Sequence, residues 1–237
     1  MTHWQIAIET SCRLGSVALL RQDRPVEQIV LAADQRTAQT LAPALHRLLT
    51  SLRAAGGSLG GISVSVGPGS FTGLRIGVTA AKSLAYALGC QVAAVDTLQA
   101  MILPMRRDFP QQNGYDAVLN AYRGQVFWRR EAHDGQPLVA TQVVDQTDWR
   151  GRLNEPNLVV AGDVWAGREW ATQWQMTQHG RLTKSDYWTP QAVEVGRLGW
   201  AAHRLGQTTD PLNLKPNYLR ESAAAEQKKL KTPGANS

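Results

Sequence analysis

The stretch that decides the fold is Ile62-Ser-Val-Ser-Val-Gly-Pro-Gly-Ser-Phe-Thr-Gly-Leu-Arg-Ile-Gly-Val78. Its first five residues alternate apolar and polar side chains, which predicts a short strand. A turn rich in glycine and proline follows. From Phe71 to Leu88 we expect a helix, which Gly89 ends. A strand that turns directly into a helix is the basic unit of an α/β fold.

The segments on either side extend this pattern. Before it, we expect three strands and an amphipathic helix, over residues 4–9, 16–21, 26–32 and 37–55. Pro43 lies inside this helix, and because proline is tolerated in a first turn, the firm helix should begin near it. After it, we expect a strand over 91–95 and a helix over 98–106. A three-stranded meander followed by β-α-β units predicts a mixed sheet.

The second half of the chain repeats this order of elements without repeating its residues. Residues 104–114 are rich in Pro, Asn and Gln and indicate a boundary. We then expect strands over 117–121, 125–130, 137–144 and 158–161, and helices over 165–175 and 191–205. The predicted organisation is an N-terminal lobe over 1–106 with the helix 71–88, a C-terminal lobe over 107–214, and a basic tail over 215–237.

Composition is typical of a globular protein. The 237 residues are 43% hydrophobic and 19% charged. No apolar run approaches the roughly 20 residues of a membrane helix, and the first residues lack the pattern of a secretory signal. Cys12 and Cys90 form no C-x-x-C pair, which favours a reducing cytoplasm. The net charge of +6 leaves open whether a polyanion such as nucleic acid is a nearby partner.

The first candidate site is Glu9-Thr10-Ser11, at the end of the first expected strand. Its hydroxyls and turn amides can donate to phosphate oxygens, and its carboxylate can position a metal-bound water. The same residues can form an ordinary turn, because Thr and Ser side chains bond their own backbone. The spacing alone favours the ordinary turn.

The second candidate is the turn Gly67–Arg75, because a helix that opens after a strand can bind anions. It lacks the Gly-Lys-Ser/Thr end of a Walker A loop, and its glycines miss the G-x-G-x-x-G spacing. The helix behind it carries Gly73, Gly77 and Ala81 four residues apart, so another backbone can approach closely. Glycine inside a helix costs up to about 1 kcal/mol against alanine, which predicts compensation by close packing. Periodicity does not separate packing on this chain's own sheet from packing on a second chain.

Other chemistry-bearing residues form no recognised catalytic set. None of the five histidines lies in an H-x-x-x-H or H-E-x-x-H spacing. Asp96 follows a strand, where it is either a site carboxylate or the N-cap of the next helix. Between Lys215 and Lys231, five basic residues against two acidic ones indicate a solvated tail or a contact with a phosphate backbone.

Three segments together resemble the TsaB (YeaZ) family: Ile6–Ser11, Val66–Val78 and Pro216–Arg220. The resemblance implies an actin-like/Hsp70-like (ASKHA) fold of two lobes with ribonuclease-H-type mixed sheets. It implies a non-catalytic subunit required for N6-threonylcarbamoyladenosine (t6A) at A37 of tRNAs that read ANN codons. In that pathway the related transferase TsaD is the partner, the ATPase TsaE joins them, and tRNA is met through the complex. A homodimer of the isolated chain is a further expectation, and a membrane partner is not expected.

The resemblance also implies roles for particular residues. The helix after Ser70 is the segment by which the family pairs, which implies an interface of Phe71, Gly73, Leu74, Gly77, Val78, Ala81 and Leu84. No catalytic or metal-binding residue and no tightly bound cofactor is implied. ATP or ADP would meet the chain at the shared interface, through Glu9, Thr10 and Ser11. The family commonly has Asp where this chain has Glu9, and this longer carboxylate argues against independent nucleotide hydrolysis. The family often has His-Ser where this chain has Thr37-Ala38, so no role is carried over to that position. The alternative is an autonomous actin-fold ATPase, kinase or peptidase.

Overall fold

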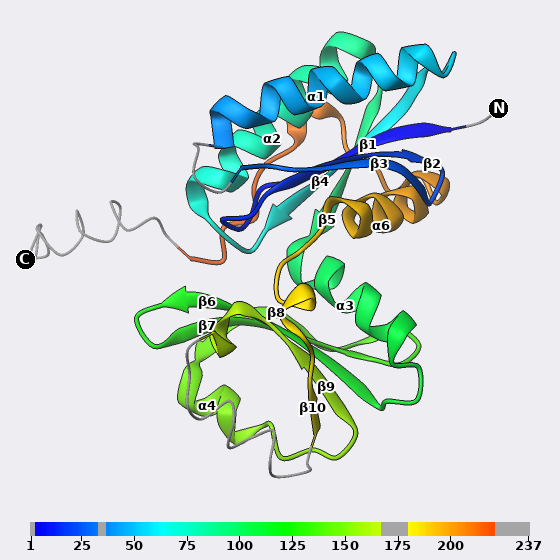
Figure 1. Cartoon of the computed structure of the whole chain (residues 1–237). Helices are drawn as coiled ribbons and strands as arrows, with labels where there is room; N and C mark the ends of the chain where they lie inside the picture. Colours follow the sequence, from blue (N-terminus) through cyan, green and yellow to red (C-terminus); the bar gives the residue numbers. More distant parts are fainter. Residues whose placement is uncertain (1–2, 33–36, 167–179, 221–237) are drawn as a thin grey trace, which may run out of the picture.

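The computed structural model describes residues 3–32, 37–166 and 180–220. These residues form two five-stranded sheets with helices between them (Figure 1). Each sheet begins with an antiparallel meander of three strands and is extended by parallel strands. The predicted mixed α/β architecture is therefore confirmed, and we call each sheet with the helices that cover it a lobe.

The first sheet has the strand order β3-β2-β1-β4-β5. Its strands are β1 (Trp4–Glu9), β2 (Ser16–Arg21), β3 (Arg24–Val30), β4 (Leu59–Gly67) and β5 (Gln91–Asp96). The helices that cover it are α1 (Thr37–Ala54), α2 (Phe71–Leu88) and α6 (Ala192–Arg204).

Alternation along β1 decides which helix covers which face of this sheet. Ile6 and Ile8 pack in one core with α1 and α2, whereas Ala7 between them packs in another core with α6. Successive side chains of a strand point to opposite faces, so bulky residues meet one helix layer and small residues meet the other. Gly196 lets α6 come close, because an added Cβ there would lie 3.2 Å from the Cβ of Ala7.

The second sheet has the strand order β10-β9-β6-β7-β8. Its strands are β6 (Gly114–Tyr122), β7 (Gln125–Ala132), β8 (Pro137–Asp145), β9 (Leu158–Ala161) and β10 (Gly180–Leu182). The helices that cover it are α3 (Thr97–Asp108) and α4 (Gln146–Gly151). The described residues of the chain also form the short 3-10 helices η1 (Asp163–Trp165), η2 (Ser185–Tyr187) and η3 (Pro211–Asn213). Ala117 packs with α3 on one face, and Val118 packs with Trp149 of α4 on the other. The sequence does not predict α4 and β10, because six and three residues are too few to show a period.

The two halves of the chain exchange a helix. α3 lies in the first half, yet Leu98 and Met101 pack in the core of the second sheet. α6 lies in the second half, yet Val195 packs on the first sheet. Each of the predicted ranges, 1–106 and 107–214, therefore contains a helix that covers the sheet of the other range.

α1 differs from its prediction at its start. It begins at Thr37 and carries Pro43 within it, so the expectation of a firm helix only from Pro43 is wrong. Proline leaves the carbonyl four residues before it without its helical donor. That residue is Gln39, and because both Gln39 and Pro43 are exposed, water can bond this carbonyl.

Two predictions concern mainly residues outside those that the structure describes. Most of the helix expected over 165–175, and the tail beyond Arg220, lie outside the described residues. Within the described residues, no helix is long and apolar enough to cross a membrane.

Candidate functional site

The turn after β1 lies directly against the loop that opens α2. Ser70 caps α2, since its side-chain oxygen accepts the backbone N–H of Gly73 at 3.2 Å. The N–H of Ser70 donates to the Ser11 carbonyl at 2.6 Å. Gly69 has a φ of +155°, and an added Cβ would lie 2.5 Å from the same carbonyl oxygen. The loop and the turn can touch here because this position is glycine.

Glu9, Thr10 and Ser11 are buried, and their polar groups bond to this chain. One carboxylate oxygen of Glu9 accepts the Ser11 N–H at 2.5 Å, and the other accepts the Ser65 hydroxyl. The Thr10 hydroxyl donates to the Gly73 carbonyl at 2.9 Å. Burial raises the pKa of the Glu9 carboxyl, and the hydrogen bonds from Ser11 and Ser65 oppose that rise. These residues fasten the turn to β4 and α2, and their role toward a nucleotide stays a prediction.

A cavity of about 420 Å³ lies between this turn and the second sheet. Its walls include Ser11 to Arg13, Pro68 to Thr72, Leu119 to Arg123, Asp163, and Asn217 to Arg220. Three of these residues are arginines, at positions 13, 123 and 220, and burial raises the pKa of the Asp163 carboxyl. An excess of positive charge suits an anionic ligand. Of the three residues predicted to contact a nucleotide, Ser11 is the one that lines this cavity.

Residues 217–220, at the start of the predicted tail, close one side of the cavity. The N–H of Asn217 donates to the Val66 carbonyl at 2.7 Å, and Tyr218 stacks on Phe71 with ring centroids 4.5 Å apart. The Arg220 guanidinium donates to the carbonyl of Ala121 in the second sheet. Residues far apart in the sequence thus form one wall. The sequence analysis did not predict that residues of the second sheet line this cavity. It did single out the motif Pro216–Arg220, which contains the segment that closes the cavity.

The small-residue face of α2 packs inside this chain. An added Cβ on Gly73 would lie 2.0 Å from the Thr10 carbonyl oxygen, and one on Gly77 would lie 2.1 Å from Thr10 Oγ1. Three further residues of this face are at most 3% exposed: Leu74, Val78 and Ala81. The close approach expected from the sequence is therefore made with β1 and its turn. This corrects the predicted interface, because α2 would have to leave its own sheet before these five residues could contact a second chain.

The remaining predicted interface residues, Phe71 and Leu84, are half-buried. The outward side of α2 carries exposed residues spaced three or four apart, which we call the outer face of α2: Thr72, Arg75, Thr79, Ser83 and Tyr86. Tyr86 is 72% exposed. Arg75 holds its guanidinium 5.5 Å from the ring centroid of Phe71. The side of α2 that can meet another protein is thus opposite the one that the small residues suggested.

Asp96, the other candidate site carboxylate, has a structural role. The Asp96 carboxylate accepts the N–H groups of Leu98 and Gln99 at 2.8 and 3.0 Å, which makes it the N-cap of α3. Among the residues that the structure describes, no group of three or more His, Cys, Asp and Glu side chains is placed to hold a metal ion.

Comparison with known proteins identifies the family of this chain. The tRNA threonylcarbamoyladenosine biosynthesis protein TsaB of Bacillus subtilis (strain 168) is 30% identical over 227 residues, which cover 92% of this chain and 95% of that protein. The chain belongs to the TsaB family. Residues 31–149 also match the family model described as TsaD, tRNA N6-adenosine threonylcarbamoyltransferase.

Solved structures support the fold of this TsaB-family chain. A Pseudomonas aeruginosa protein described as similar to the peptidase YEAZ superposes with a TM-score of 0.72 at 25% identity, and the match covers 92% of this chain and all of that one. The activator of 2-hydroxyisocaproyl-CoA dehydratase from Clostridium difficile superposes with a TM-score of 0.50 at 8% identity, over 93% of this chain and all of that one. The expected actin-like/Hsp70-like fold of two mixed sheets is confirmed.

Proposed function

We propose that this TsaB-family chain is a non-catalytic subunit required for t6A modification at A37 of tRNAs that read ANN codons. It binds the TsaD transferase and activates it together with TsaE in the cytoplasm, and it meets tRNA through the complex. The Bacillus subtilis relative, which aligns with almost the whole chain, supports the pathway by its name. The TsaD model that matches residues 31–149 supports a partner of related fold.

We propose that the chain pairs with TsaD through the outer face of α2. Residues 31–149 include all of α2, so TsaD has a segment related to it. Two chains that share a fold can pair through equivalent helices about an approximate two-fold axis. The exposed, regularly spaced side chains of the outer face suit such a helix–helix contact, and Phe71 and Leu84 lie at its margins. The same face supports a homodimer when TsaD is absent.

The satisfied polar groups of the turn after β1 support a structural role for Glu9 and Thr10. Their carboxylate and hydroxyl oxygens are already bonded within the chain. ATP or ADP in the complex would meet Ser11 and the arginines of the cavity, and we expect no tight binding by the chain alone.

Reconstitution tests the proposal. Purified chain, TsaD and TsaE are combined with unmodified tRNA, threonine, bicarbonate and ATP, together with the enzyme that supplies threonylcarbamoyl-AMP. We expect t6A, measured by mass spectrometry of digested tRNA, only when all the proteins are present. Modified tRNA from the chain without TsaD would overturn the assignment as an accessory subunit.

A matched pair of variants tests the interface. Tyr86→Arg places a charge on the outer face of α2 and should abolish co-elution with TsaD. Leu138→Arg changes an exposed apolar residue on β8, which is 58% exposed, and should leave co-elution unchanged. Equal co-elution of both variants with TsaD would show that the outer face is not the contact.

The interlobe cavity favours one other function, an autonomous ATPase, kinase or peptidase. Its volume of about 420 Å³ and its arginines suit a small anionic ligand. Isothermal titration of the isolated chain with ATP and Mg²⁺ separates the two functions. Micromolar, magnesium-dependent binding would favour the autonomous enzyme, and heats equal to those of dilution would favour the accessory subunit.

A further inference from the structure

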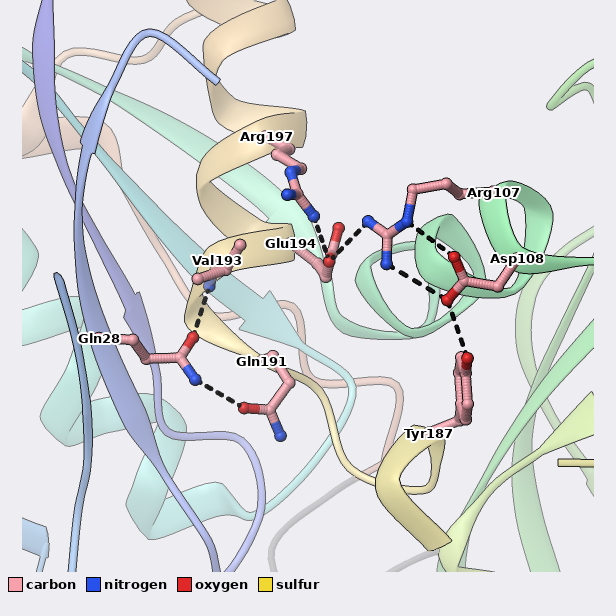
Figure 2. A network of polar contacts seen from close by, with 8 residues as sticks. All are labelled: Gln28, Arg107, Asp108, Tyr187, Gln191, Val193, Glu194 and Arg197. Carbon is pink, nitrogen blue, oxygen red and sulfur yellow. Dashed lines mark hydrogen bonds and ion pairs between the residues drawn. The ribbon is translucent and has the colours of Figure 1, made fainter. Parts of the chain in front are cut away.

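A network of side chains joins the two lobes at the end of α3 (Figure 2). Arg107 donates to the carboxylate of its neighbour Asp108 at 2.9 and 3.4 Å, and to Glu194 of α6 at 3.2 Å. Arg197 donates to the same Glu194 oxygen at 2.5 Å. The Tyr187 hydroxyl of η2 donates to Asp108 at 2.8 Å. We call these five residues the interlobe latch.

Each end of the latch is anchored in a different lobe. On the first lobe, the N–H of Ala192 donates to the Ser16 hydroxyl at 2.9 Å, and the N–H of Val193 donates to the Gln28 side chain at 3.3 Å, which tie the start of α6 to β2 and β3. On the second lobe, Met101 and Met105 of α3 are buried in the core of the sheet. A change in the Arg107–Glu194 distance is therefore a change in the placement of one lobe against the other.

The contact between α3 and α6 allows such a change. Ala100 packs with Ala192 and Val195 in one small core, and side chains this small offer a smooth surface for rotation. Arg107 lies seven residues further along α3, about 10 Å along the helix axis. A rotation of about 15° at Ala100 would move Arg107 by nearly 3 Å, at about 1.5 Å of rise per residue. A cavity of about 250 Å³ lined by latch residues, Met101 and Pro104 leaves room for this movement.

The closed latch lacks one hydrogen-bond donor. Glu194 is 6% exposed, and its second carboxylate oxygen has no hydrogen-bond partner. Both arginines share the first oxygen instead, as Figure 2 shows. A buried carboxylate oxygen without a donor opposes the closed arrangement, whereas an opened latch would admit water to it. A network that is favourable in part and unsatisfied in part has two competing arrangements.

We propose that the interlobe latch switches the lobes between two discrete angles and thereby sets the width of the 420 Å³ cavity, whose walls come from both lobes. Closure is held by the Arg107–Glu194 ion pair, and opening is favoured by the unsatisfied Glu194 oxygen. A ligand in the cavity or a protein that spans the lobes would bias this equilibrium by its differential affinity for the two angles. The proposal stands on the contacts of this chain and does not rest on the proposed function.

Pulsed electron paramagnetic resonance on the full chain tests the latch. Spin labels are attached at Ala54→Cys on α1 and Leu138→Cys on β8, in a background in which Cys12 and Cys90 are alanine. Both label sites are exposed and lie on different lobes. We expect Arg107→Gln to shift the main distance by at least about 3 Å, the displacement given by the helix rise, and to reduce the closed population. An unchanged distance distribution in the folded variant would overturn the proposal.

Arg106→Gln is the matched control. This neighbouring arginine lies in the last turn of the same helix, but it donates to the carbonyl of His133, just after β7, at 3.1 Å. It also lies 3.6 Å from the carboxylate of Glu131 on β7, in the same lobe. Its removal should leave the distance distribution unchanged, and an equal shift in both variants would refute the latch as the cause. If Arg107→Gln does not fold, 1 M NaCl replaces it, because the Debye length falls to about 3 Å. The chain that keeps Arg107 should then lose closed population, and a distribution insensitive to salt would overturn the proposal.

Discussion

Gly77→Ala should destabilise this chain, although alanine is the better helix former. The new Cβ would lie 2.1 Å from Thr10 Oγ1, well inside ordinary contact. Alanine gains about 1 kcal/mol of helix propensity over glycine, while overpacking a tight core costs about 1–3 kcal/mol. The Thr10 hydroxyl can retreat only by giving up its bond to the Gly73 carbonyl, which costs about 1 kcal/mol more. These terms sum to a net loss of about 1–3 kcal/mol in the free energy of unfolding.

A second substitution separates the side-chain clash from the backbone clash. In a Thr10→Ala background the nearest remaining atom to the new Cβ of Gly77→Ala is the Cβ at position 10, at 3.4 Å. Gly77→Ala should there be neutral or stabilising. Gly73→Ala meets the carbonyl oxygen of residue 10 at 2.0 Å, which no side-chain change removes, so it should stay destabilising in both backgrounds.

Urea unfolding followed by circular dichroism measures these differences. Thr79→Ala on the outer face of α2 is the control, because exposed substitutions usually change stability by less than about 0.5 kcal/mol. The reasoning fails if Gly77→Ala stabilises the chain by about 1 kcal/mol, the value of helix propensity alone. That result would mean that α2 does not sit this close to the turn after β1.

Three further perturbations have expected outcomes. Ser70→Ala should lower the free energy of unfolding by about 1 kcal/mol through loss of the α2 cap, with Ser70→Gly costing only a few tenths; equal losses in urea titrations would argue against the cap. The pKa of Glu9 is raised in the folded chain above its ordinary 4.5, so the folded state holds this proton more tightly and stability should fall as pH rises above about 4.5. Glu9→Gln should flatten that slope in urea titrations across pH, and an unchanged slope would contradict it. Arg130→Met leaves the buried Asp116 carboxylate without its partner at 2.6 and 2.9 Å and should cost about 3–5 kcal/mol in thermal unfolding; a loss below about 1 kcal/mol would show that the pair is replaceable.

Most of the fold could be predicted because its signals are local. The alternation in Ile62–Val66 and the helix start at Ser70 depend on neighbours a few residues away, so the sequence alone predicts β4 and α2. The range 37–55 was predicted for α1, but the regular helix before Pro43 was not, because the effect of Pro43 depends on whether water reaches the carbonyl of Gln39. That exposure is set by tertiary packing.

The candidate site shows where local patterns stop being informative. The spacing of Gly73 and Gly77 correctly predicted that another backbone approaches α2 closely. The approaching group is Thr10 in the turn after β1 of the same chain, far earlier in the sequence. Buried small residues look alike in sequence whether they meet their own sheet or a partner. The family resemblance implied pairing through this helix and so favoured a partner, but Ala81 is buried inside this chain.

The exchanged helices set the order in which this protein can be completed on the ribosome. The first sheet has all its strands once Asp96 has been made, yet α6 begins only at Ala192. Until then the face that carries Ala7, Ala18 and Leu20 lacks α6, and from the earlier helices Ala100 of α3 is the buried residue that packs in this core. Because α3 covers the other sheet, no single cut in the chain yields a lobe with both faces protected. A nascent or truncated chain without α6 therefore exposes an apolar surface that can associate with other chains, and this face is protected only once α6 has been made.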